Sequence, residues 1–284
     1  MNIGKEKYDS IPIPDALDGV VDSAMRRAER SKRLHVLRRT AACAAVVVCV
    51  LLASANIMPI YTYASQIPVL GSIVQVLQIG SGGEITDGVQ GQAENYGESV
   101  KISFSSADGE LNAVPHYSVT HYSAPDRVVL TLSGVRGIDF ESLLGSLLGT
   151  DGVLDAYRMM ILDDSRFGVV ILLEDGWSCE AAEYSDPGAL VLRFKDTGER
   201  SDGSEIYYLR TEAMPYTDEL GLLCEEYHNE NAAQLKTQSG EYIVTIGEYG
   251  SESEAQEALE ALNELHGDHG LFVASGTAQT VPEN

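Results

Sequence analysis

The longest uncharged segment of the chain predicts a membrane-spanning helix. Residues 40–60 carry no charge, and their apolar side chains cover about the 20 residues that a helix needs to cross a bilayer. Arginine and lysine dominate the residues just before this segment. By the positive-inside rule we expect a single-pass protein of the cell membrane, with a cytoplasmic N-terminus and an extracytoplasmic chain after residue 60. Ala53-Ser54-Ala55 also fits a signal-peptide cleavage site, but the long charged segment before it favours a retained anchor.

The residues before the span, 1–39, predict a short amphipathic helix. Pro12 and Pro14 favour an extended start, because proline restricts its own backbone and that of the preceding residue. Apolar residues then recur at helical spacing and form one stripe, which includes Leu17, Val21 and Met25. This stripe would suit either anionic lipid or a cytoplasmic partner protein, and the sequence leaves both open.

Residues 61–97 are expected to form a juxtamembrane helix and a linker. Apolar side chains at three- and four-residue spacing predict one helical face, which comprises Ile67, Leu70, Ile73, Val74 and Leu77. No cationic residue accompanies this face, so we expect it to pack on the following domain rather than on lipid. The run Gly80-Ser81-Gly82-Gly83 predicts a flexible hinge.

Period-two alternation predicts a β-sandwich-like domain over residues 98–196. The expected strands are rich in β-branched and aromatic residues and are separated by Gly, Asp and Pro; they span 100–104, 117–122, 127–133, 167–173 and 189–194. One helix interrupts them, with Asp139 as its cap and Gly149 as its stop. Its apolar face comprises Phe140, Leu143, Leu144, Leu147 and Leu148.

A polar linker at 200–204 leads to a second outer domain, residues 204–280, with a βαββαβ (split-βαβ) pattern. Strands are expected at 206–211, 232–237, 242–249 and 271–274, and helices at 216–228 and 251–265. Ser251 and Glu254 have the spacing of a capping box. The whole chain is therefore predicted to be α+β, with an N-terminal transmembrane helix, a β-sandwich-like domain and a βαββαβ domain.

Charge separates the two sides of the predicted span. The chain has 19 Lys and Arg against 43 Asp and Glu, a formal net charge of -24. Residues 84–284 hold 37 of the acidic residues and only 10 of the basic ones. Binding to nucleic acid needs a basic face that displaces counterions, so we expect no nucleic acid partner. Membrane lipid is the partner that the pattern predicts directly.

The sequence contains no signature of catalysis. Neither G-x-S-x-G, H-E-x-x-H nor a phosphate-binding loop occurs, so we expect no enzyme and no cofactor. His266, Asp268 and His269 form the one tight histidine cluster, for which a solvated turn is favoured over a metal site. Cys179 and Cys224, one in each outer domain, are candidates for a disulfide because the extracytoplasmic compartment permits one.

Residues 8–80 resemble the DUF4179 family in IPIPDALDGVVDSAMRRAERSKR, in the apolar span and in ASQIPVLGSIVQVLQI. Members of that family are single-pass bacterial envelope proteins discussed as anti-sigma regulators. The resemblance implies the same topology, and it implies a sigma factor as a candidate cytoplasmic partner for residues 8–39.

The first outer domain resembles the AMIN domain, a β-rich module of cell-wall amidases and secretion-channel proteins. The resemblance lies in HYSVTHYSAPDRVVLTLSGVRG and in the strand pairs that follow residue 153. It implies localisation through peptidoglycan or an envelope partner. Thr131 stands where the family often has an acidic residue, which is a departure from the pattern.

The second outer domain is similar to the SPOR domain in YIVTIGEY, followed by a helix that opens with Ser-Glu-Ser-Glu-Ala. SPOR domains bind septal glycan strands on the sheet face opposite their helices. If Leu209, Val244 and Ile246 point to the helices, alternation puts the candidate ligand-binding residues on the open face: Tyr208, Arg210, Ile243 and Thr245. A plain α+β domain with a solvated sheet is the alternative.

Three functions follow from these patterns. The first is a non-catalytic, membrane-anchored cell-envelope protein whose outer domains bind peptidoglycan glycan or an envelope partner. The alternative is an anti-sigma-type regulator that senses envelope stress through its outer domains. A wall-turnover enzyme would need a catalytic site that the sequence does not contain.

Overall fold

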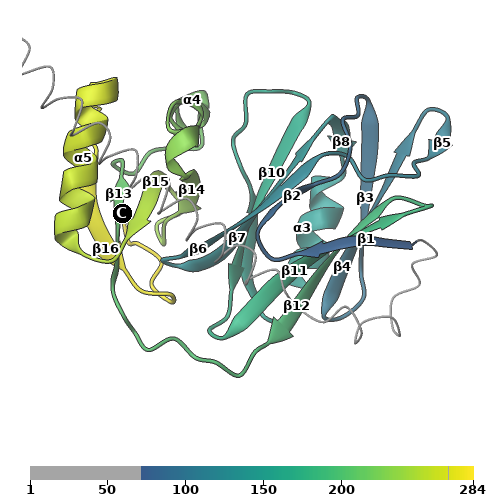
Figure 1. The fold of residues 1–284 in the computed structure, drawn as a ribbon, viewed down its shortest axis with the longest axis horizontal. Coiled ribbons are helices and arrows are strands. Elements are labelled where there is room, and N and C mark those ends of the chain that lie inside the picture. Colours follow the sequence, from purple (N-terminus) through teal and green to yellow (C-terminus); the bar gives the residue numbers. More distant parts are fainter. Residues whose placement is uncertain (1–71, 268) are drawn as a thin grey trace, which may run out of the picture. The chain divides into compact units, whose positions relative to one another are not determined.

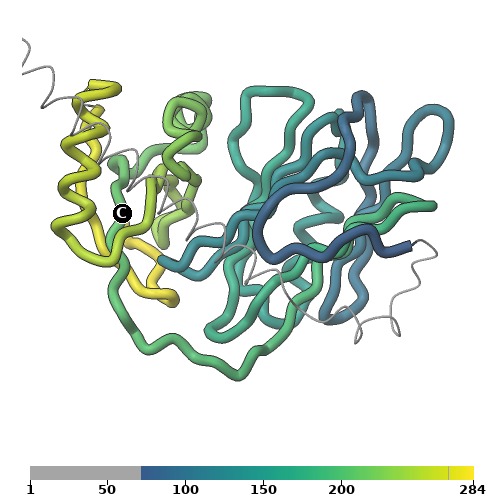
Figure 2. Tube along the Cα trace, in the orientation of Figure 1, coloured from purple at the N-terminus to yellow at the C-terminus, as the bar shows by residue number. Residues whose placement is uncertain are grey.

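The computed structural model describes residues 72–267 and 269–284, all of which belong to one compact unit of the chain, Ala55–Asn284. The predicted cytoplasmic segment and membrane span therefore lie outside the described residues. Within the described ranges, no helix is both long and apolar enough to cross a membrane. The described part is mostly β, with three α-helices and several antiparallel sheets. Figure 1 draws these helices and strands, and Figure 2 traces the path of the chain through them.

Two sheets pack face to face in the first domain. The first sheet has the order β1-β11-β12-β4-β3-β8, with β5 paired to β4, and the second has the order β2-β6-β7-β10-β9. The strands of the first sheet are β1 (Ser72–Leu77), β3 (Val89–Asn95), β4 (Ser99–Ser106), β5 (Gly109–Glu110), β8 (Val135–Ile138), β11 (Trp177–Ser185) and β12 (Ala189–Asp196). Those of the second are β2 (Gly80–Gly82), β6 (Tyr117–Ser123), β7 (Asp126–Ser133), β9 (Val153–Arg158) and β10 (Arg166–Leu173).

The sandwich core forms because alternate residues of each strand point inward. In β7 the inward residues are Val128, Leu130 and Leu132, and they meet residues of the first sheet such as Ile102 and Leu192. All of these side chains are at most 2% exposed. The predicted sandwich is therefore confirmed in its principal strands.

Helix α3 (Phe140–Leu148) has the predicted bounds. The Asp139 carboxylate accepts a hydrogen bond from the Ser142 amide at 3.1 Å, which satisfies one of the free N–H groups of the first turn. Leu143 and Leu147 are buried, as predicted, whereas Leu148 is 50% exposed. Including Leu148 in the apolar face was wrong, because that side chain lies past the contact with the sandwich.

The predicted juxtamembrane helix is wrong where the structure describes it. Residues 72–77 form β1, which pairs antiparallel with β11. Three of these six residues are β-branched, and such side chains fit a pleated sheet better than a helix. The expected glycine hinge also contains a strand, since β2 pairs with β6 through Gly80, Ser81 and Gly82. The sandwich therefore includes residues that the sequence assigned to a linker.

The second domain follows a connection without helix or strand, residues 197–205. Its sheet has the order β14-β15-β13-β16, all antiparallel, and its elements occur in the predicted βαββαβ order. The elements are β13 (Ile206–Arg210), α4 (Asp218–Glu226), a 3₁₀ turn (His228–Glu230), β14 (Ala232–Lys236), β15 (Tyr242–Tyr249), α5 (Glu252–His266) and β16 (Phe272–Gly276).

Both helices of this domain cover the same sheet face. Leu220 of α4 and Leu262 of α5 share one apolar core with Leu209, Val244 and Ile246 of the sheet. The predicted inward row of the sheet is therefore confirmed. At the start of α5 the Ser251 hydroxyl accepts from the Glu254 amide at 3.3 Å, as a capping residue should.

Adjacent leucines of α3 provide a matched test of the sandwich core. We expect Leu147→Ala to lower the free energy of unfolding by about 2–5 kcal/mol, because it leaves a cavity at a fully buried site. Leu148→Ala should change it by about 0.5 kcal/mol or less, since that side chain is half exposed. Urea denaturation measures both values, and equal losses from the two variants would contradict this placement of α3.

Candidate functional site

The outer face of the second sandwich sheet, which points away from the sandwich core, supports the second domain. Alternation puts Val129 of β7 and Val170 and Leu172 of β10 on this face. These residues form an apolar cluster with Tyr122, Tyr157, Met159 and Ala233, the last of which belongs to β14. Strands β7 and β10 are therefore covered on both faces over part of their length, once by the sandwich core and once by the second domain.

Arg127 joins the two domains through a buried guanidinium group. Its Nη1 donates to the Pro125 carbonyl at 3.0 Å, and its Nη2 donates across the interface to the Thr245 hydroxyl at 2.9 Å. The guanidinium also lies over the Tyr122 ring, 4.5 Å from its centroid. Burial lowers the pKa of the guanidinium, but arginine has so high a pKa that it stays charged.

Further polar contacts fix how the domains dock. The Glu248 carboxylate accepts from the amides of Ser123 and Ala124 at 2.6 and 3.1 Å. The Gln234 side chain makes two hydrogen bonds to the backbone of Met160, each 2.7 Å long, one as donor and one as acceptor. Each of these contacts satisfies a backbone group of the sandwich with a side chain of the second domain.

The predicted open face of the second domain is covered. Tyr208, Arg210, Ile243 and Thr245 lie opposite the helical face, as alternation predicts, but their exposed fractions are 3%, 5%, 0% and 2%. The prediction that this face is solvent-exposed is wrong, because the outer face of the sandwich sheet docks on it through the hydrogen bond from Arg127 to Thr245 and through the apolar cluster that contains Ala233. A glycan strand has no access to these four residues in this arrangement.

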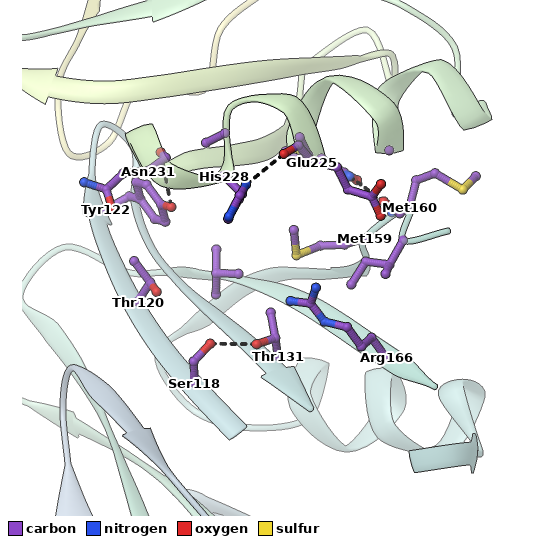
Figure 3. A pocket seen from close by; sticks show the side chains of 16 residues that line it. Ser118, Thr120, Tyr122, Thr131, Met159, Met160, Arg166, Glu225, His228 and Asn231 are labelled. Carbon is purple, nitrogen blue, oxygen red and sulfur yellow. Dashed lines mark hydrogen bonds between the residues drawn. The ribbon is translucent and has the colours of Figure 1, made fainter. Parts of the chain in front are cut away.

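A cleft remains open beside the covered face. It has a volume of about 250 Å³ and lies between the outer face of β6 and β7, the segment after β9, and the α4–β14 region. Figure 3 shows a lower wall with hydroxyl groups from Ser118, Thr120 and Thr131, and an upper wall with Glu225, His228 and Asn231. Apolar side chains complete the lining: Val129, Met159, Met160, Ile161 and Ala232.

The polar groups of the cleft have defined hydrogen-bonding states. The hydroxyls of Ser118 and Thr131 pair with each other at 2.6 Å. His228 Nδ1 lies 2.9 Å from the Glu225 carbonyl, and because a carbonyl only accepts, Nδ1 carries a proton. In the tautomer with the proton on Nδ1, Nε2 is free to accept a hydrogen bond, and Figure 3 shows it directed into the cavity. Arg166 reaches the same cavity from the first residue of β10.

Both candidate disulfide cysteines are free thiols, so the predicted bridge is not formed. Cys179 points into the sandwich core, and Cys224 packs against the core of the second domain at the cleft. Burial raises the pKa of the Cys224 thiol to about 12 and raises the pKa of the Cys179 thiol well above its usual range. Each thiol is held by a different core, which explains why the pair does not meet.

Two residues of the predicted histidine cluster, His266 and His269, lie at the end of α5 and shortly after it, and neither lines the cleft. Asp268 lies outside the described residues. His269 Nδ1 is 3.0 Å from the Tyr227 hydroxyl and 3.3 Å from a Glu226 carboxylate oxygen. Within residues 72–267 and 269–284, no group of His, Cys, Asp and Glu is arranged to hold a metal ion. The predicted partner-binding residues Leu17, Val21 and Met25 lie outside the described residues and stay a prediction.

Sequence reasoning missed the cleft. Its polar residues come from two domains and from distant segments, and they meet only because the domains dock. One signal was present: Val128–Leu130 and Val169–Leu173 are continuous apolar runs rather than alternating ones, which is typical of strands covered on both faces.

The interface arginine gives a test of docking. Thr245→Val removes the hydroxyl that accepts from Arg127 and that donates to the Ala233 carbonyl. We expect a loss of about 1–3 kcal/mol in the free energy of unfolding, because a buried charged donor loses its acceptor. Thr280→Val, at an exposed threonine, should change it by about 0.5 kcal/mol or less. An equal effect of the two variants would argue against this contact.

The free thiols give a second test. At pH 8 a thiol with a pKa of about 12 is ionised to only about one part in 10⁴, so alkylation of Cys224 in the folded chain should be very slow. Since the pKa is raised, labelling should accelerate as the pH rises toward 12 and also on denaturation. Mass spectrometry of non-reduced peptides measures this, and a peptide pair linked through Cys179 and Cys224 would refute it.

Comparison with known protein families, with curated proteins and with solved structures finds no match for the chain.

Proposed function

We propose that this chain is a non-catalytic, membrane-anchored protein of the cell envelope whose outer domains bind peptidoglycan glycan. The ligand is held in the cleft beside the docked second domain. One observation supports the proposal most strongly. The SPOR-like sheet face of the second domain is covered, and the cleft beside it is an accessible concave surface.

The lining of the cleft suits a sugar. A pyranose ring has apolar C–H faces and a rim of hydroxyl groups, so it needs apolar contacts beside hydrogen-bonding partners. The cleft offers both, with Val129 and Met159 beside the hydroxyls of Thr120, Ser118 and Thr131. Its volume of about 250 Å³ is below the range of about 300–1,000 Å³ for drug-sized ligands, which favours one sugar unit of a longer strand.

The state of the polar groups favours binding over catalysis. The Ser118 and Thr131 hydroxyls are hydrogen-bonded to each other rather than to a base that would activate them. Cys224 lines the same cleft, but its pKa of about 12 keeps the thiol protonated and unreactive. Neither group meets the requirements of an activated nucleophile.

The sequence supplies the location. The predicted span at 40–60 and its basic N-terminal flank would hold residues 72–284 outside the membrane, next to the wall. The acidic excess of this part favours its solubility. Anti-sigma activity of residues 1–39 is the alternative function and depends on residues outside those described.

Retention of the full chain on purified peptidoglycan sacculi tests the proposal. Thr120→Trp fills the cleft from an outward position of β6, and we expect it to weaken retention about tenfold or more, because a bound sugar loses its contact surface. Gln92→Trp, at an exposed position of β3, is the matched control and should bind like the unmodified chain. Failure of the unmodified chain to bind sacculi, or undiminished binding of Thr120→Trp, would contradict the proposal.

A further inference from the structure

We infer that the cleft recognises an acidic sugar, with Arg166 holding the carboxylate and His228 accepting from a ring substituent. This inference rests on the proposed function and specifies its ligand. Peptidoglycan glycan alternates a neutral N-acetylated sugar with one that bears a lactyl group, and the carboxylate of that group is free only where the stem peptide has been removed. The inference therefore distinguishes the two units of a glycan strand that lacks stem peptides.

Arg166 has the charge and the freedom to bind a carboxylate. Its side chain is exposed, and it forms no ion pair within 4.0 Å among the described residues, although that part of the chain is rich in carboxylates. Arg136 and Arg200, by contrast, are each paired with aspartates. A planar guanidinium can bind a carboxylate through two parallel hydrogen bonds, so an unpaired one at a cleft favours an anionic ligand.

The nearest acidic turn is already occupied by its own hydrogen bonds. The Asp163 carboxylate accepts from the Ser165 amide at 2.8 Å and from the Ser165 hydroxyl at 2.7 Å, using the same oxygen for both. The hydrogen bond from the Ser165 hydroxyl is the main reason that the pKa of Asp163 is lowered. This carboxylate is thus held in the turn before β10. The charge of Arg166 makes a smaller contribution to lowering its pKa, but the two groups form no ion pair within 4.0 Å, and the guanidinium extends into the cleft.

His228 complements Arg166 from the opposite wall. The hydrogen bond between Nδ1 and the Glu225 carbonyl fixes the ring, so Nε2 presents an acceptor to the cavity. A sugar hydroxyl or acetamido N–H can donate to this atom. Thr120 and the Ser118–Thr131 pair lie on the opposite wall of the cleft, below His228 in Figure 3. The cleft therefore has a cationic donor on one side and a ring nitrogen that can accept a hydrogen bond on the other, a pattern that fits a sugar with one carboxylate.

A phosphate would fit this cleft less well than a carboxylate. Phosphate sites usually combine several cationic or backbone N–H donors. The cleft lining contains one arginine, and Glu225 contributes a negative charge on the facing wall. A monoanion that shares its charge over two oxygens matches a single guanidinium.

The test is an NMR titration of the full chain with N-acetylmuramic acid and with N-acetylglucosamine, which lacks the lactyl carboxylate. We expect the acid to bind about tenfold more tightly, because it gains a charge-assisted hydrogen bond to Arg166. The difference in affinity should shrink with added salt, which screens the charges. Arg166→Gln should remove the preference. Arg200→Gln, at an exposed arginine outside the cleft, should keep it.

Two results would overturn the inference while leaving the proposed function standing: equal affinity of the unmodified chain for both sugars, or sacculus retention without any Arg166-dependent preference. Inorganic phosphate that binds as tightly as the acid would overturn it as well. Loss of binding to both sugars and to sacculi would instead remove the proposed function, so the two failures are distinguishable.

Discussion

The structure depends on covering the outer face of the β2-β6-β7-β10-β9 sheet. Val129, Val170 and Leu172 give that face an apolar surface that would be costly to leave in water. The second domain covers it with the sheet face that has no helices, and Arg127 provides the polar anchor at its centre. Because a buried guanidinium is expensive unless it is hydrogen-bonded, Thr245 and Pro125 favour one docking register over others.

The cleft is a consequence of that docking. The outer residues of β6 and β7 change from Arg127 and Tyr122, which are buried, to Thr120, Thr131 and Ser118, which the second domain does not reach. At the same boundary α4 and the turn after it place His228 over the hydroxyl groups. The sheet face that was predicted from the sequence to bind a ligand is thus used as a structural interface, and the accessible polar surface lies at its edge.

Local patterns predicted the elements better than their partners. Helix α3, helix α5 and strand β15 followed from capping residues and periodicity, because those signals act within one element. The prediction of a helix over residues 72–77 was wrong. In so short a segment the apolar spacing fits the helical period and the strand period alike, and the pairing with β11 decides between the two. The contact that Thr245 makes with Arg127 depends on another domain, which no pattern within residues 204–280 reports. The cleft could not be predicted for the same reason, because Arg166 and His228 are separated in sequence and meet only through docking.

Hydrogen exchange at three backbone amides tests the docked arrangement most directly. The amides of Ser123, Ala124 and Met160 belong to the sandwich, and their acceptors are side chains of the second domain, Glu248 and Gln234. Our account predicts that all three are protected from exchange in the native full chain, to a degree that approaches the strands beside them. Exchange at the rate of an unfolded chain at these amides, with β7 and β10 still protected, would contradict it.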